Sequence, residues 1–127
     1  MESVEIVDLV NNAMQFYHGK RILITGNSGF KGSWLSHILL NLKANVTGYA
    51  LQPGTHPNLF SILKLKERMT TTFGDVRNYQ KVKEVIKKTR PEIIFHLAAQ
   101  PIVSEGYKDP LYTFNTNIIG TANLLQA

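Results

Sequence analysis

Apolar and polar positions along the chain follow two kinds of pattern. Short apolar runs, typical of strands buried within a sheet, lie at residues 21–25, 45–50, 69–73 and 92–99. Between these runs, apolar residues recur every three or four positions, as they do on one face of a helix. Alternating strands and helices favour parallel strands joined by right-handed crossovers. We therefore expect an α/β fold with an incomplete, doubly wound parallel sheet of about four strands.

The first crossover helix is predicted over residues 30–42. Its apolar positions should form the buried face, and its polar positions should face solvent. The apolar set is Trp34, Leu35, Ile38, Leu39 and Leu42, and the polar set is Ser33, Ser36, His37 and Asn41.

The remaining helices are predicted from their caps and spacing. Asn78 can cap a helix that Pro91 stops, and residues 112–127 resume helical spacing. A helical turn is expected at 60–65. Residues 1–15 also have helical spacing, so we treat them as an extension that either docks on the body or frays.

Composition narrows the class of protein. The chain has 127 residues, of which 43% are hydrophobic and 18% charged, as expected for one ordered domain with a core. It contains no cysteine, which excludes disulfides and thiolate metal sites and fits a cytoplasmic location. The acidic start lacks a long apolar stretch, so we expect neither a secretory signal nor a membrane span.

The net charge of +5 is the one compositional hint of an anionic partner. Many of the basic residues lie in 64–68 and 80–90, where apolar residues recur at helical spacing. That arrangement is typical of the solvated faces of amphipathic helices. We therefore expect no nucleic-acid partner, and a phosphate-bearing small molecule remains compatible with the charge.

Three glycines, Gly26, Gly29 and Gly32, lie between the first strand and the first helix. In a doubly wound fold, Gly26 would permit the sharp turn, Gly29 would let a pyrophosphate approach the backbone, and Gly32 would let the helix pack closely. The helix N-terminus would then face the phosphates. The turn predicts a dinucleotide site, although glycines used only for tight packing would look similar. No G-K-[ST] phosphate loop follows, which disfavours kinase or ATPase chemistry.

Five segments of the chain resemble, in order, the amino-terminal half of extended short-chain dehydrogenases/reductases, above all the nucleotide-sugar 4,6-dehydratases. The segments are TGNSGFKGSWL, VTGYAL, GDVRNYQKV, PEIIFHLAAQP and NTNIIGTANLL. The resemblance covers residues 16–127 and implies the amino-terminal part of a Rossmann-type NAD(P)-binding domain. It implies NAD as the cofactor, with NADP not excluded.

The activity implied by the resemblance belongs to a longer parent enzyme. In it, NAD removes a hydride from the fourth carbon of a nucleotide-linked glucose, water is lost, and the hydride returns to the sixth carbon. Two alternatives stay open, namely a related epimerase or reductase and a non-catalytic binding module. The partners expected are the dinucleotide and, in the parent, the nucleotide sugar.

The same resemblance implies a set of cofactor-binding residues. Asp75 would hydrogen-bond the adenine, although an acid there could equally serve as a turn or cap. Asn117 would tie the cofactor pocket to the last helix, and an exposed helical amide is the alternative. The full set is Gly26, Asn27, Ser28, Gly29, Phe30, Asp75, Val76, Ala98, Ala99, Gln100 and Asn117.

The sequence departs from the family pattern at two places. No acid follows the second strand to bind the ribose hydroxyls, and Gln52 stands near that position. Ser104 replaces an arginine that the resemblance leads us to expect, which puts substrate contacts on its loop in doubt.

No catalytic residue is assigned. The family's Tyr-x-x-x-Lys pair should follow a fifth strand, and the pair at Tyr79 and Lys83 lies on the wrong helix, so we interpret it as coincidence. Without a phenol activated by a lysine, we expect the chain to be catalytically inert. His96 is interpreted as a core histidine, and no metal site is predicted. The unpaired edge of the fourth strand predicts self-association or low solubility.

Overall fold

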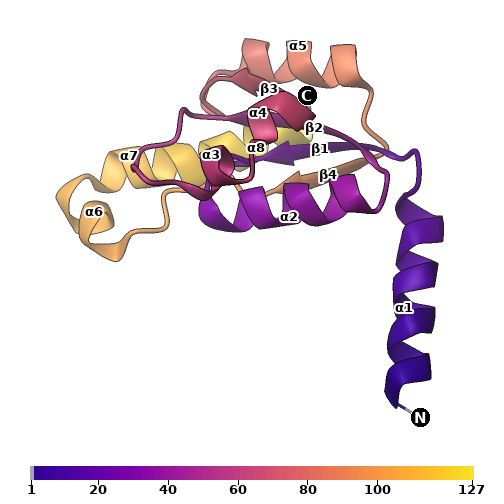
Figure 1. Cartoon of the computed structure of the whole chain (residues 1–127). Coiled ribbons are helices and arrows are strands. Elements are labelled where there is room, and N and C mark those ends of the chain that lie inside the picture. Colours follow the sequence, from indigo (N-terminus) through magenta and orange to yellow (C-terminus); the bar gives the residue numbers. More distant parts are fainter. Residues whose placement is uncertain (1) are drawn as a thin grey trace.

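The fold is built around a parallel sheet. We describe a computed structural model that places residues 2–127, with side chains from residue 5 onward. The strands lie in the order β3-β2-β1-β4, and all their pairings are parallel. This order confirms the predicted doubly wound fold, with β4 at an edge (Figure 1). The strands are β1 (Arg21–Thr25), β2 (Asn45–Ala50), β3 (Thr70–Phe73) and β4 (Ile93–His96).

Helices cover both faces of the sheet, as Figure 1 shows for α2 and α5. None of those within residues 2–127 is long and apolar enough to cross a membrane. Residues 110–126 form one nearly continuous helix that is interrupted by a π-helical turn, η1. The elements are α1 (Glu2–Tyr17), α2 (Phe30–Asn41), α3 (Leu59–Ile62), α4 (Leu65–Arg68), α5 (Tyr79–Thr89), α6 (Val103–Lys108), α7 (Pro110–Phe114), η1 (Asn115–Ile119) and α8 (Gly120–Gln126).

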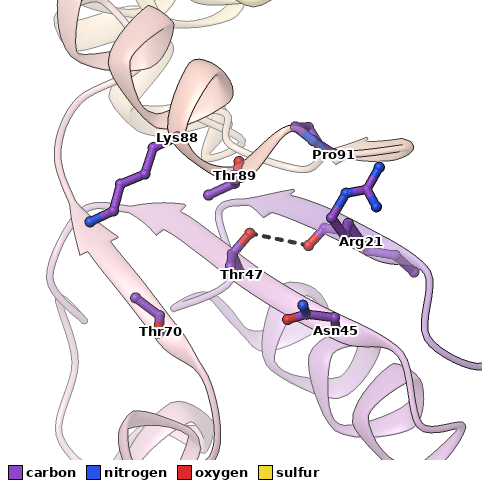
Figure 2. A pocket seen from close by; sticks show the side chains of 8 residues that line it. Arg21, Asn45, Thr47, Thr70, Lys88, Thr89 and Pro91 are labelled. Atoms are coloured by element: carbon purple, nitrogen blue, oxygen red, sulfur yellow. Dashed lines mark hydrogen bonds between the residues drawn. The ribbon is translucent and has the colours of Figure 1, made fainter.

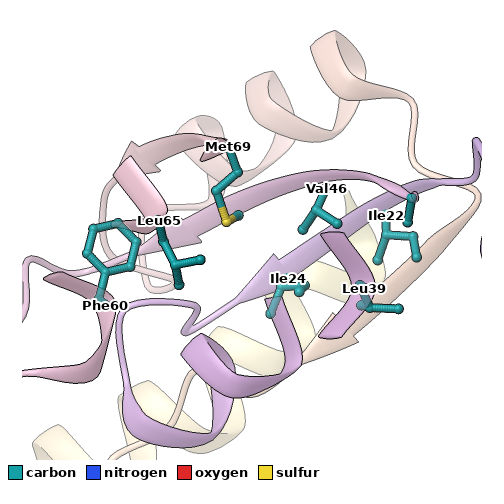
Figure 3. Packing of buried hydrophobic residues seen from close by; sticks show 8 residues of the cluster. Ile22, Ile24, Leu39, Val46, Phe60, Leu65 and Met69 are labelled. Carbon is teal, nitrogen blue, oxygen red and sulfur yellow. The ribbon is translucent and has the colours of Figure 1, made fainter. Parts of the chain in front are cut away.

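Alternate residues of β1 supply the cores on the two faces of the sheet. Ile22 and Ile24 pack with α2, β2 and the short helices α3 and α4 (Figure 3). Leu23 packs on the other face with Tyr49, Val76 and residues of α5. Four of the five β1 residues are buried, as expected for a strand covered on both faces.

The buried face of α2 agrees with the prediction only in part: Leu39 is buried, with Leu35 and Leu42 packed against the core. Small residues face the sheet, since Gly32, Ser33 and Ser36 are buried, whereas Trp34 and Ile38 are 44% and 50% exposed. The serine hydroxyls donate to backbone carbonyls, Ser33 Oγ to Asn27 O at 3.1 Å and Ser36 Oγ to Gly32 O at 2.7 Å. Because these hydroxyls need no water, the helix can approach β1 closely.

One further prediction needs correction. The sequence predicts the fourth strand over 92–99, but its regular pairing ends at His96, and the chain then turns toward Gly26.

Of the two alternatives for the amino-terminal extension, docking is not seen. Ile6 and Leu9 are 62% and 68% exposed, and α1 stands away from the sheet (Figure 1). Tyr17, at the end of α1, packs against the core.

Candidate dinucleotide-binding site

A cavity of about 1220 Å³ opens beyond the carboxyl ends of β1, β2 and β4. Ligands of doubly wound folds bind at this edge of the sheet. The glycine turn forms one wall, the loop after β2 forms a second, and the segment from β4 to α7 forms a third. Six of the predicted cofactor residues line the cavity: Gly26, Ser28, Gly29, Phe30, Ala99 and Gln100.

Gly26 and Gly32 have the structural roles that the sequence predicted for them. Gly26 has a φ of +74°, and its N–H donates to Tyr49 O at 2.9 Å. A Cβ at Gly26 would lie 2.7 Å from the Ala98 nitrogen, and a Cβ at Gly32 would lie 2.8 Å from the Asn27 Cα. Neither neighbour can move independently, because both are backbone atoms. These two glycines let β1, the end of β4 and α2 converge.

Gly29 is different, because an added Cβ would meet only the Gly26 carbonyl oxygen, at an ordinary 3.4 Å. It is the N-cap of α2, and its carbonyl accepts from Ser33 N at 2.8 Å. Within residues 2–127, no group accepts from the N–H of Phe30, Lys31 or Gly32. Three free N–H donors at the positive end of a helix, beside open space, are suited to bind a phosphate group.

Three predicted residues support the pocket without lining it. Asn27 is fully buried and donates through Nδ2 to Thr71 Oγ1 at 2.9 Å. Val76 is 4% exposed and packs in the core, with Ala98 against the same cluster. These side chains fix the turn and the ends of the strands from behind.

The Asp75 carboxylate forms a pair with the Arg77 guanidinium and does not line the cavity. Arg77 Nη2 donates to Asp75 Oδ2 at 2.6 Å, and Arg77 Nε donates to both carboxylate oxygens at 3.0 Å. These hydrogen bonds hold the pKa of Asp75 below its ordinary value. The Tyr49 hydroxyl donates to Asp75 O at 2.8 Å, and burial raises the pKa of Tyr49 to about 12.

Asn117 clamps the loop that follows β4. Its Oδ1 accepts from Gln100 N at 2.8 Å, and its Nδ2 donates to Gln100 O at 3.1 Å. The Gln100 side chain donates to Thr113 Oγ1 at 2.9 Å, which adds a second tie to the same helix. Asn117 is therefore not an exposed helical amide. It lies in η1, and π-helical turns are frequent at functional sites.

His96 lies at the centre of a chain of hydrogen bonds that fixes its tautomer. Thr25 Oγ1 accepts from Ala98 N at 3.2 Å and lies 2.6 Å from His96 Nδ1. His96 Nε2 lies 3.1 Å from Thr121 Oγ1, and the Thr121 hydroxyl donates to Asn117 O at 2.6 Å. Nε2 must therefore donate and Nδ1 accept. Both ring nitrogens of His96 thus have partners, which agrees with its interpretation as a core histidine, and burial lowers its pKa.

The pocket contains residues that the sequence did not single out. Lys31, between two of the glycines, lines the cavity together with residues 53–55 and 57–59 after β2. On the third wall, the lining includes Glu105 of α6, Asp109 between α6 and α7, and Tyr112 of α7. The position of Lys31 next to Gly32 could have suggested its role, whereas the other positions depend on how the loops pack.

One interpretation made from the sequence agrees with the geometry. Tyr79 and Lys83 lie on α5 with the Lys83 ammonium 5.5 Å from the Tyr79 ring centre, and neither lines the cavity. No cluster of potential metal ligands occurs within residues 2–127. Gln52 does line the cavity, and Ser104 does not.

A second hollow, of about 320 Å³, lies at the amino ends of the strands (Figure 2). Thr47, Thr70 and Lys88 line it, and the Thr47 hydroxyl donates to Ile22 O at 3.3 Å. Arg21 also lines it, and its side chain donates to Arg90 O and forms an ion pair with Glu92. The C-terminus of α5 points to this side, and its dipole disfavours anions. The pocket at the glycine turn is therefore the candidate site.

Comparison with known proteins places this geometry in a family. The family model described as GDP-mannose 4,6 dehydratase matches residues 23–127. The CDP-glucose 4,6-dehydratase of Salmonella typhimurium is 47% identical over 111 residues, which cover 87% of this chain and 31% of that protein.

Solved structures agree with the fold. The epimerase Mth375 of Methanothermobacter thermautotrophicus superposes with a TM-score of 0.79 and 25% identity, covering 93% of this chain and 34% of that one. The UDP-glucose 4-epimerase of Thermus thermophilus, in complex with NAD, superposes with a TM-score of 0.73 and 30% identity. The match covers 84% of this chain and 32% of that one. The chain thus spans about a third of the length of these relatives.

Proposed function

The chain belongs to the GDP-mannose 4,6 dehydratase family, and we propose that it is the NAD-binding part of a nucleotide-sugar 4,6-dehydratase. The observation that carries the proposal is the set of three free N–H groups of Phe30, Lys31 and Gly32 facing an open cavity at Gly29. A pyrophosphate fits this arrangement because the amides and the helix dipole both favour an anion. NAD as the occupant is supported by the NAD complex of the Thermus thermophilus relative.

Each predicted contact has a distinct part in this proposal. The turn from Gly26 to Phe30 binds the diphosphate, and the segment Ala98–Gln100, clamped by Asn117, forms the wall beside the far end of the cofactor. The Asp75 carboxylate lies outside the cavity lining and is engaged by Arg77, and in this proposal it accepts a hydrogen bond from the adenine amino group at the edge of the site. Asn27 and Val76 act by packing behind the turn.

The proposed reaction is the conversion of CDP-glucose to CDP-4-keto-6-deoxyglucose, supported by the 47% identity to the Salmonella typhimurium enzyme. When bound, NAD supplies the temporary hydride acceptor. We propose that these 127 residues position the cofactor but leave the sugar hydroxyl without a base, because Tyr79 and Lys83 lie outside the pocket. We further propose that the protein works in the cytoplasm and that its exposed β4 edge drives self-association.

Calorimetric titration with NAD tests the proposed binding site. Gly29→Ala should leave the free energy of unfolding within about 1 kcal/mol of the wild type, because its Cβ meets no close neighbour. The same change should weaken NAD binding by roughly tenfold or more, because the methyl group separates phosphate and amides. Gln80→Ala, at an exposed position of α5 outside the cavity lining, is the control and should bind normally. Unchanged binding by Gly29→Ala would contradict the proposal.

A related epimerase or reductase is the second candidate, because the UDP-glucose 4-epimerase relative shares the fold. Product analysis with CDP-glucose and with UDP-glucose, on this chain extended by the residues of its own gene, separates the two. Conversion of CDP-glucose to a 4-keto-6-deoxy product supports the dehydratase. Inversion of UDP-glucose without loss of water supports the epimerase, and no turnover despite NAD binding supports a non-catalytic module.

A further inference from the structure

We propose that helix α1 is an exchange arm: its apolar side packs on the outer face of α2 in a second copy of the chain, and the second copy returns the same contact. The receiving surface, which we call the α2 strip, consists of Trp34, His37 and Ile38 of α2 and Arg68 of α4. None of these residues lines the nucleotide pocket, so the inference goes beyond the proposed function. Because each copy has one arm and one strip, the exchange closes a two-fold dimer.

Helix α1 has an apolar side that the rest of the chain leaves uncovered. Its apolar residues recur every three or four positions and so share one side of the helix, with Asp8, Asn12 and Gln15 opposite. The exposed apolar side chains are Ile6, Val7, Leu9, Val10, Met14 and Phe16. A continuous apolar surface of this kind marks a site of contact with another molecule.

The connection between α1 and β1 holds this helix away from its own body. His18 N donates to Met14 O at 3.0 Å, and Gly19 N donates to Lys43 O at 2.8 Å. Tyr17 packs against the core at the same point. These contacts fix the direction in which α1 leaves the body, so its apolar side is available to another molecule (Figure 1).

The α2 strip offers an apolar surface with a cationic edge. Trp34 and Ile38 lie one helical turn apart, and both are exposed. The Trp34 ring lies edge-on to the His37 ring, with 6.1 Å between their centres. Arg68 Nη1 lies 2.7 Å from His37 Nδ1, and Arg68 Nη2 donates to Asn41 Oδ1 at 3.3 Å, so the guanidinium lies beside the same face of α2. Tryptophan and arginine are enriched where proteins contact one another.

Charge favours this strip over a second α1 as the partner of α1. The helix carries Glu2, Glu5 and Asp8 and no basic residue, so two such helices would repel each other. Glu5, one turn before Leu9, borders the apolar side. In the described part of the chain, the salt bridges involve neither Glu5, Asp8 nor Arg68. Each surface therefore carries an unpaired charge of the sign that attracts the other.

The fluorescence of Trp34 tests the inference, because Trp34 is the chain's only tryptophan and belongs to the strip. As the concentration of the 127-residue chain rises, the emission maximum should move to shorter wavelength, because docking removes the indole from water. Sedimentation over the same range of concentration should show a change from monomer to dimer. The concentration at which half the shift has occurred is the quantity to compare between variants.

Variants of the arm and of the strip should act alike. Ile6→Gln and Ile38→Gln should each raise the half-shift concentration by about tenfold, because each removes an apolar contact. Val103→Gln, at an exposed apolar position of α6, is the matched control and should leave it unchanged. An equimolar mixture of the two isoleucine variants should regain part of the shift, because the intact arm of one fits the intact strip of the other.

Charge reversal gives a second, independent comparison. Glu5→Lys should raise the half-shift concentration several-fold, because it places a cation against the Arg68 edge. Glu84→Lys makes the same change at an exposed position of α5 and should have no such effect. Equal effects of the two reversals would refute the charge pairing and overturn the inference.

Three other results would also overturn it. A chain that stays monomeric at every concentration forms no such dimer. A short-wavelength maximum that does not depend on concentration would place α1 on the strip of its own chain. Dimer loss in Ile6→Gln but not in Ile38→Gln would assign α1 to a different surface. NAD binding should be the same in both isoleucine variants, so each of these results leaves the proposed function intact.

Discussion

The two sides of the candidate pocket are held in place by different forces. On the glycine side, β1 and α2 meet through backbone contacts that leave no room for a Cβ at Gly26 or Gly32. On the side of β4, the loop is held by side-chain hydrogen bonds from Asn117 and around His96, and no residue of β4 is fully buried. Packing therefore sets the first wall, whereas a few polar contacts set the second.

This difference predicts that the two walls will fail in different ways. Overpacking the glycine side should unfold the chain, because backbone atoms cannot yield. Removing one clamp on the β4 side should loosen a loop and leave the sheet folded, because Gln100, where the clamp acts, belongs to neither core cluster.

The largest effect is expected for Gly32→Ala. The new Cβ would lie 2.8 Å from the Asn27 Cα and closer still to the Gly26 carbonyl oxygen. We expect a loss of about 3 kcal/mol or more in the free energy of unfolding, measured by urea denaturation. Gly54→Ala is the control, because its Cβ meets nothing within 4 Å. Equal stability of the two variants would show that packing does not set this wall.

Asn117→Ala should have the next largest effect. It removes both hydrogen bonds to Gln100, which should cost about 1–3 kcal/mol and weaken NAD binding as the loop moves. Amide hydrogen exchange should show loss of protection at Ala98, Gln100 and Ile102 while β1 stays protected. If β1 lost protection to the same extent, the two walls would not be separable.

Acid should act on the β4 side through His96. Burial lowers the pKa of His96 below its ordinary value of 6.5, so the unfolded chain takes up this proton first as the pH falls. The stability that depends on neutral His96 is present above pH 6.5 and declines below it. Urea midpoints between pH 5 and pH 7.5 should show this slope, and His96→Gln should flatten it. An unchanged slope in the variant would exclude His96 as its source.

The smallest effect is expected for Leu125→Gln on α8. Leu125 is 84% exposed, so the free energy of unfolding should change by no more than about 0.5 kcal/mol. Self-association, followed by light scattering, should decrease because an apolar contact is removed from the β4 side. Leu39→Gln, at a 2% exposed position of α2, should in contrast destabilise strongly. Similar losses for both would contradict the distinction between the two sides.

The parts of the fold that local patterns determine could be predicted from the sequence. β1 and β2 begin and end where their apolar runs do, because buried parallel strands need apolar residues on both faces. The face of α2 could not be predicted, because Ser33 and Ser36 satisfy their hydroxyls within the chain and are buried in place of Trp34 and Ile38. Apolar periodicity cannot reveal a helix that packs through small polar residues.

The candidate site likewise has one part that the sequence predicts and one part that it does not. The glycine turn was predicted because its conformational demands show directly in the sequence, and the structure gives Gly26 a positive φ. The walls made by 51–59 and by α6 and α7 depend on contacts between segments far apart in the chain, such as Ser28 with Leu51. A single sequence does not show such contacts, so Lys31 and Glu105 were missed as lining residues.

The π-helical turn at Asn115–Ile119 has a consequence for how the last helix could change over evolutionary time. Such a turn accommodates one more residue than an α-helical turn, so a deletion there would restore regular geometry. Every side chain on one flank would then rotate by about 100° relative to the other flank. Asn117 would then point away from the loop that it clamps, while the helix itself became more regular. A one-residue deletion in this turn would therefore improve the helix and disrupt the pocket.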